Sequence, residues 1–225
     1  MTVTTESMHR TLQIWRPDGG SGSGFTIDRH GRQWLVTAQH VVEGVEPGQV
    51  KVVSREGKSY DGLEHVPTNP DADVAVFSLF HKRLTLNYEL EPSTSGVALG
   101  QDSYFLGFPL GWSTQNEGEQ LPFVKKAVLS GMTKTTSGVP VWMFDGMNLQ
   151  GFSGGPIVFK HNMTGKWHVM GVVHGYQTTP VLVHDHAGRA IGRVNTNTGF
   201  FVGFGINHAT DAIDEFVKKS AVSDL

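Results

Sequence analysis

Gly151-Phe152-Ser153-Gly154-Gly155-Pro156, followed at once by the apolar run Ile157-Val158-Phe159, is the most informative stretch of this 225-residue chain. Glycines around a serine let the backbone turn sharply, and the apolar run predicts a buried strand directly after the turn. A serine between glycines is most often only a turn residue. Its hydroxyl is a poor nucleophile unless a base lies beside it. The stretch therefore indicates a catalytic serine only if a histidine and a carboxylate can be assigned elsewhere.

The candidate base is His40 and the candidate acid is Asp73. His40 follows an apolar run and a short turn of small residues, a pattern that predicts an imidazole ring at the edge of a strand. Asp73 directly precedes the apolar run 74–77, which predicts another buried strand. Asp71 is a competing acid, because residues two apart on a strand point to the same side, but it lies closer to the preceding proline turn. A lone histidine is more often structural, and His40 is one of eleven in the chain.

Three blocks carry a family resemblance: GSGFTID with WLVTAQHVV, then DADVAVF, then GFSGGPIVF. They occur in the order His, Asp, Ser and spread over most of the chain. Together they resemble the trypsin-fold serine proteases, and in their motifs the bacterial HtrA/Deg-type peptidase domain. A weaker fourth match lies at 104–131. The resemblance implies two six-stranded antiparallel β-barrels with the active site between them, and we expect no PDZ domain after the second barrel.

The resemblance also implies a serine endopeptidase with a Ser-His-Asp triad. Ser153 would attack the peptide carbonyl and form an acyl-enzyme, His40 would take and return the proton, and Asp73 would orient the imidazole. The backbone N–H groups of Gly151 and Ser153 would form the oxyanion hole. An esterase of the α/β-hydrolase type is excluded, because its acid and histidine follow the serine in the chain. A catalytically silent binding module with the protease fold stays open, since a fold does not imply a function.

The substrate-binding residues follow only from the resemblance. Counting back from Ser153 in the family pattern places Met147 at the floor of the primary specificity pocket, which predicts an uncharged residue before the scissile bond. The segment His174-Gly175-Tyr176 resembles the strand that pairs with the substrate backbone. Glutamate-specific relatives carry a histidine one position earlier in their pattern, so glutamate specificity is an alternative. A second alternative is that His174 has a purely structural role and bonds a neighbouring turn.

One departure from the family concerns activation. Trypsin-like digestive members carry an acid directly before the serine, and a newly cut N-terminus pairs with it to set the oxyanion hole. Here that position is Phe152, and no matching N-terminal activation sequence is visible. We therefore expect the oxyanion hole to form without zymogen cleavage, held by packing of Phe152 or switched by a separate regulatory protein.

The composition favours an all-β fold, because 28 glycines and 10 prolines suit many short strands and turns better than helices. A 225-residue chain with 38% hydrophobic residues can bury the core of one two-barrel unit. We expect residues 1–225 to form a single trypsin-like peptidase domain, with a first barrel at about 10–90, a second at 97–206 and a C-terminal helix at 208–220. The second barrel is predicted to include strands at 167–174, 190–194 and 200–206.

The C-terminal helix is indicated by Ile213, Phe216 and Val217, which share one face at helical spacing. Acidic residues come early and Lys218 and Lys219 come late, which suits the helix dipole. We expect this helix to pack against the second barrel. Residues 89–96, rich in Glu, Pro, Ser and Thr, are predicted to connect the two barrels.

Charge and residue usage limit the partners. A net charge of −3 gives no basic face, so nucleic acid is not expected as a partner. The expected partner is a polypeptide substrate. The absence of cysteine favours a reducing compartment, and the N-terminus lacks the apolar region of a signal peptide. No apolar run is long enough to span a membrane. These features predict a cytoplasmic protein without a membrane partner.

Histidines near the C-terminal half raise a metal alternative. His184-Asp185-His186, with His161 and His168 upstream, could supply zinc ligands. Gly188 suggests that the His-Asp-His string lies at the tip of a hairpin, where a solvated loop is the simpler interpretation. We therefore expect no metal and no other cofactor.

Overall fold

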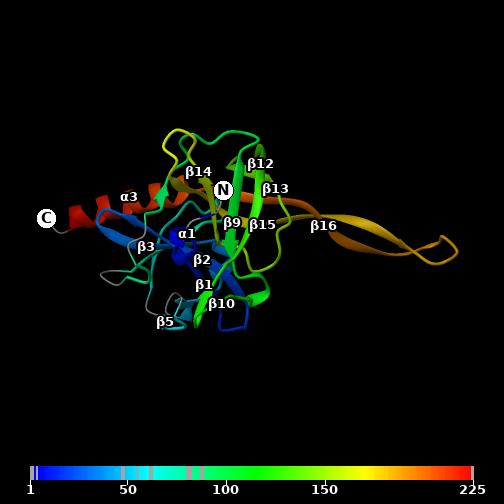
Figure 1. Cartoon of the computed structure of the whole chain (residues 1–225), viewed down its shortest axis with the longest axis horizontal. Helices are drawn as coiled ribbons and strands as arrows, with labels where there is room; N and C mark the ends of the chain where they lie inside the picture. The colour runs from blue at the N-terminus through cyan, green and yellow to red at the C-terminus, as the bar shows by residue number, and fades with distance from the viewer. Residues whose placement is uncertain are drawn as a thin grey trace.

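The computed structural model describes residues 3, 5–46, 49–54, 56–60, 63–79, 83–86 and 89–223. Two β-sheets make up most of it, and a helix lies at its C-terminal end (Figure 1). The predicted all-β fold with two barrel-like halves and a C-terminal helix is confirmed. No helix among the described residues is long and apolar enough to cross a membrane.

The first sheet is built from N-terminal strands in the order β5-β4-β1-β2-β3-β7-β6. Side chains on both faces of this sheet are almost completely buried, Phe25 and Trp34 on one face and Phe77 on the other, which explains why its strands are continuous apolar runs. A four-residue helix, α2 (Gln39–Val42), directly follows β3. The elements of this half are α1 (Thr5–Arg10), β1 (Thr11–Trp15), β2 (Ser21–Arg29), β3 (Arg32–Thr37), β4 (Lys51–Val53), β5 (Ser59–Tyr60), β6 (Glu64–Val66) and β7 (Ala75–Ser78).

The second sheet has the order β14-β9-β12-β13-β16-β15-β8, and an additional pairing of β14 with β15 closes six of these strands into a ring. β8 lies within the predicted connector and pairs with β15 in parallel, outside the closed ring. A small hairpin, β10 with β11, stands apart. The elements of this half are β8 (Glu91–Pro92), β9 (Asp102–Gly107), η2 (Pro109–Gly111), β10 (Thr114–Asn116), β11 (Glu119–Leu121), β12 (Phe123–Lys134), β13 (Pro140–Asp145), β14 (Pro156–Lys160), β15 (Trp167–His184) and β16 (Ala190–Gly205).

Aromatic rings fill the centre of the second barrel. Phe105 packs edge-on against Phe152, with ring centroids 4.9 Å apart, and Phe144 stacks on Phe201 at the same separation. All four side chains are fully buried. Pairs of this kind stabilise a core by about 0.5 to 1.5 kcal/mol beyond their buried area. Phe152, the residue before the candidate nucleophile, is therefore anchored in the core of this barrel.

The C-terminal helix α3 (Asn207–Ser223) packs against the first sheet, so the prediction that it packs against the second barrel is wrong. The ring of Phe216 meets Trp34 of β3 edge-on at 6.0 Å. Asp214 accepts hydrogen bonds from the guanidinium of Arg29 in β2, at 2.5 and 2.6 Å. The apolar face of α3 and its Asp214 both contact residues of the N-terminal half. The periodicity of the helix sequence could not reveal which half it contacts.

Strands β15 and β16 continue beyond the barrel as a two-stranded ribbon, residues 177–198, which we call the arm. It projects from the body on the side away from α3 (Figure 1). Its apolar side chains lie in solvent, with Leu182 half exposed and Ile191 two-thirds exposed. The predicted strands ended at 174 and began at 190, so the sequence analysis missed most of the arm. His184 and His186 lie at its tip, where Asp185 bonds Arg189.

Removing the arm should leave the body folded. Thr178 and Asn197 are paired residues, so deleting residues 179–196 and joining the ends through an Asn-Gly turn preserves the register. Because the removed side chains contribute little to the core, the free energy of unfolding should change by less than about 1 kcal/mol. Urea denaturation followed by tryptophan fluorescence measures this change. A loss of several kcal/mol would show that the body depends on the arm.

Candidate active site

His40 is presented at the edge of the first sheet by α2. The side chains of its neighbours Val41 and Val42 are buried, whereas the His40 imidazole is 42% exposed. The guanidinium of Arg16 donates to the backbone carbonyl of His40 at 3.2 Å. Because the two valines are buried, the short helix α2 is oriented so that the His40 imidazole faces outward, as the sequence pattern predicts.

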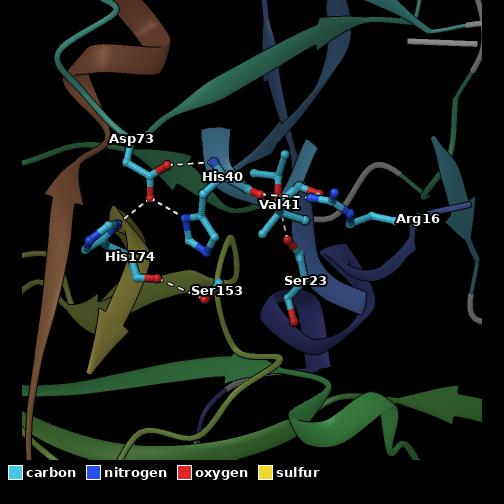
Figure 2. A network of polar contacts seen from close by, with 8 residues as sticks. Arg16, Ser23, His40, Val41, Asp73, Ser153 and His174 are labelled. Atoms are coloured by element: carbon cyan, nitrogen blue, oxygen red, sulfur yellow. Dashed lines mark hydrogen bonds and ion pairs between the residues drawn. The ribbon is translucent and has the colours of Figure 1, made fainter. Parts of the chain in front are cut away.

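Asp73 holds His40 at two points. One carboxylate oxygen, Oδ1, accepts from the backbone N–H of His40 at 2.8 Å, and the other, Oδ2, contacts Nδ1 of the imidazole at 2.7 Å (Figure 2). Asp71 lies in the turn before β7, where its own N–H bonds Asn69. Of the two competing acids, the structure brings Asp73 to the histidine.

A second histidine meets the same carboxylate. Nδ1 of His174 makes a very short contact with Oδ2 of Asp73, and the two imidazole rings lie 5.5 Å apart and perpendicular (Figure 2). Burial alone would raise the pKa of Asp73, but the hydrogen bonds from His174 and His40 outweigh it and hold that pKa well below its usual range. Asp73 is therefore a carboxylate at neutral pH and can stabilise an imidazolium.

His174 reaches Asp73 because β15 has a bulge there. In the pairing of β15 with β16, Val173 lies opposite Gly203 and Gly175 opposite Val202, so His174 is an extra residue without a partner. A bulge of this kind re-aims a side chain next to a site. The sequence analysis left the role of His174 open between a pocket and a support residue, and here the imidazole contacts the acid.

Ser153 lies beside these groups without being bonded to His40. Its Oγ donates to the backbone carbonyl of His174 at 2.9 Å (Figure 2). No hydrogen bond joins Ser153 to His40 among the described residues. The three predicted triad residues are thus in one place, with His40 and Asp73 engaged and the serine hydroxyl turned toward the carbonyl of His174.

The turn before Ser153 sets the direction of two backbone donors. Phe152 N–H bonds the carbonyl of Leu149 at 3.3 Å, and Gly151 has φ of +99°, which together make a type II turn. The carbonyl of Gln150 accepts from Leu110 N–H, and the N–H of a trans peptide points opposite to its carbonyl. The N–H of Gly151 therefore faces away from Leu110, and by the same rule that of Ser153 faces away from Gly155.

Ser23 joins the first sheet to this turn, and the sequence analysis missed it as a site residue. Its Oγ donates to the carbonyl of Gly151 at 2.7 Å and accepts from Phe108 N–H at 2.9 Å. Its N–H donates to the carbonyl of Ser153 at 2.8 Å. Gly154 packs so closely here, with φ of +83°, that an added Cβ would lie 2.1 Å from the carbonyl oxygen of Ser23. The glycines around Ser23 in the first motif block are the signal that could have indicated such a close approach.

The predicted substrate-binding residues lie in two segments. Met147 is half exposed, whereas its neighbour Asn148 is completely buried. Neither polar atom of the Asn148 side chain has a hydrogen-bond partner among the described residues. Gly175 and Tyr176 follow the bulge in β15, and Tyr176 is 39% exposed. Asn148 is thus an uncompensated polar group five positions before Ser153, which motif spacing could not single out.

His40, Asp73 and His174 are also the residues that could hold a metal ion, within the part of the chain that the structure describes. One ligand atom from each lies within 4.8 Å of the other two. Two imidazoles and a carboxylate form a donor set that zinc uses in enzymes.

Residues 22–171 match the model of the family described as trypsin-like peptidase domain. The chain belongs to this family. The matched residues hold all three members of the predicted triad, and the family makes the chain a hydrolase of the serine protease class. The sequence matches none of the curated proteins with which it was compared.

Several solved structures share the fold. The Rv3671c protease of M. tuberculosis, in its inactive form, superposes with a TM-score of 0.62 and 19% identity over 93% of this chain and 89% of that chain. The HtrA-type protease AlgW with a tripeptide gives a TM-score of 0.65 and 17% identity over 96% of this chain and 62% of that chain. At these identities the likeness shows the double-barrel fold, and it agrees with the HtrA-type resemblance of the motifs.

Replacing Ser23 by alanine should destabilise the turn that carries Ser153. The change leaves the buried Gly151 carbonyl and Phe108 N–H without their shared partner, which should lower the free energy of unfolding by about 1 to 3 kcal/mol. Chemical denaturation measures the loss, and Ser130→Ala on an exposed part of β12 is the matched control. Equal stability of the two variants would show that Ser23 does not support the turn.

Proposed function

We propose that this chain is a serine endopeptidase that cleaves polypeptides through Ser153, His40 and Asp73. The observation that carries the proposal is the two-point contact of Asp73 with the backbone and ring of His40, with the hydroxyl of Ser153 close by on His174. Asp73 fixes the tautomer in which Nδ1 of His40 carries the proton, so Nε2 is left as the base. The full chain would work as one peptidase domain.

The reaction begins when the Ser153 hydroxyl turns from the carbonyl of His174 toward Nε2 of His40. His40 takes the hydroxyl proton as the oxygen bonds to the peptide carbonyl carbon. The negative charge that develops on the carbonyl oxygen would be met by the N–H groups of Gly151 and Ser153, whose direction the type II turn fixes. His40 then protonates the leaving amine, and water releases the acyl group by the same route in reverse.

The oxyanion hole would not need a cleaved N-terminus. In place of the acid of the digestive relatives, Phe152 is buried among the rings of the second barrel, and its N–H closes the turn on Leu149. Packing thus supplies what an ion pair supplies in those relatives. Whether a regulatory protein acts on the chain, and its cytoplasmic location, stay predictions from the sequence.

An extended substrate would add to β15. The β14 side of this strand is covered as far as Val173, whose N–H and carbonyl bond the backbone of residues 154 and 155. From His174 onward no described strand pairs with that edge. An added peptide strand along residues 174–176 would lie directly beside Ser153.

We propose an uncharged residue before the scissile bond. Met147, half exposed where the family pattern places the pocket floor, supports an uncharged side chain, and the buried amide of Asn148 beside it adds no charge to this segment. Glutamate specificity is less well supported, since the Nδ1 of His174 is engaged by Asp73. A regulated or silent protease fold remains a second candidate, favoured by the bond of Ser153 to His174 rather than to His40.

Labelling with a fluorophosphonate probe tests the nucleophile. The intact chain should be labelled and should cleave peptides, and Ser153→Ala should lose labelling and roughly a million-fold in kcat. Asp73→Asn should lose about 10⁴-fold in kcat, because it favours the wrong tautomer of His40. Asp71→Asn is the matched control and should keep its activity. A folded chain that neither labels nor cleaves would favour the binding module.

The role of Asn148 can be separated from stability. Asn148→Leu keeps the branched shape of the side chain and removes two buried unpaired polar atoms, so it should raise the free energy of unfolding by up to about 3 kcal/mol, reduced by the cost of fitting the larger methyl groups. If the amide binds substrate, kcat/KM for peptides with a polar residue before the scissile bond should fall at the same time, relative to peptides with an apolar one. Denaturation and a peptide library measure the two effects. A variant that is more stable and keeps the original preference would exclude Asn148 from substrate recognition.

A further inference from the structure

We propose that His40, Asp73 and His174 form an inhibitory binding site for a divalent transition-metal ion, with zinc as the best-suited ion. Metal binding itself depends only on these three side chains. Its inhibitory effect rests on the proposed peptidase function, because it acts by occupying the base of that mechanism.

The ligand atoms already converge on one point. Nδ1 of His40 and Nδ1 of His174 both face Oδ2 of Asp73, and all three lie within 4.8 Å of one another. The two rings are perpendicular, so their lone pairs can meet at one ion without the rings stacking. Both imidazole side chains are 42% exposed, which leaves the ion a path from solvent.

The carboxylate is held in place independently of the two rings. Oδ1 of Asp73 bonds the backbone N–H of His40, and the Asp73 side chain is only 14% exposed. This hydrogen bond to Oδ1 orients the carboxylate, so that Oδ2 can bind a metal ion. In a tetrahedral site with zinc–ligand distances near 2.1 Å, ligand atoms lie roughly 3.4 Å apart. The distance between His40 Nδ1 and Asp73 Oδ2 is 2.7 Å and the contact of His174 Nδ1 is shorter, so both exposed rings must move outward to admit the ion.

The donor set selects the type of ion. Imidazole nitrogen favours zinc, copper and nickel, whereas magnesium and calcium prefer oxygen ligands. Two histidines and one carboxylate also leave a fourth tetrahedral position for water. We therefore expect zinc to bind and magnesium not to compete with it at similar concentrations.

Bound metal would switch off the base by changing its tautomer. Three dative bonds form, from the two Nδ1 atoms and Oδ2, and the two hydrogen bonds to Asp73 break. Each neutral ring keeps one proton, which exchanges through solvent from Nδ1 to Nε2, so no net proton is released. Nε2 of His40 then carries a hydrogen and cannot accept the proton of Ser153. A single ion would thereby inactivate the chain reversibly.

Zinc binding can be measured without any activity. In the Ser153→Ala chain, isothermal titration calorimetry with zinc chloride should show a site that His174→Asn and, separately, His40→Asn each weaken at least about tenfold. His186→Asn at the tip of the arm is the matched control and should leave this site unchanged. Circular dichroism of each variant verifies its fold, and using two ligand variants keeps the test decisive if one of them unfolds.

The activity of the intact chain completes the test. Zinc should slow fluorophosphonate labelling, and a chelator should restore it, whereas His174→Asn should require at least about tenfold more zinc for the same fractional slowing. Absence of zinc binding, or binding that only His186→Asn weakens, would overturn the site. Binding that depends on His174 in a chain that never labels or cleaves would uphold the site and refute the proposed peptidase.

Discussion

The carboxylate of Asp73 is the point at which the two halves of the molecule meet chemically. It lies just before the buried strand β7 and bonds His40 from the same half, yet it also contacts His174 from the closed ring of the second half. Ser23 makes a second connection, from the first sheet to the turn that carries Ser153. A small rotation of one sheet against the other would break both connections. The geometry of the site therefore depends on how the two sheets are docked more than on either sheet alone.

Motif order singled out the candidate site residues that lie in short, self-contained stretches. His40, Asp73 and Ser153 each adjoin an apolar run whose burial fixes the local backbone, so their surroundings could be inferred from a few neighbours. The type II turn at Gly151 belongs to the same group, because the glycine allows the required φ. The two-barrel fold followed from the family resemblance that these blocks carry, whereas the density of glycine and proline indicated only an all-β fold.

Features that depend on contacts between distant segments could not be inferred in this way. The helix α3 packs on Trp34 and Arg29, which lie far from it in sequence, and its own periodicity carries no information about which sheet it meets. The contact of His174 with Asp73 arises from a bulge, one extra residue in a ladder whose register only the fold defines. Asn148 was missed because the absence of a hydrogen-bond partner is a property of packing, and no spacing rule reports it.

The arm divides one continuous strand between two environments. Residues of β15 in the barrel have paired strands on both edges. Those beyond Tyr176 pair only with β16, and their side chains are exposed. A two-stranded ribbon is marginally stable in water. Its amide hydrogens should therefore exchange with deuterium through opening of the ribbon alone, while those of residues 169–173 should wait for much rarer openings of the barrel. One continuous strand would thus show two levels of protection from exchange. The change between them would fall close to His174, whose carbonyl bonds Ser153.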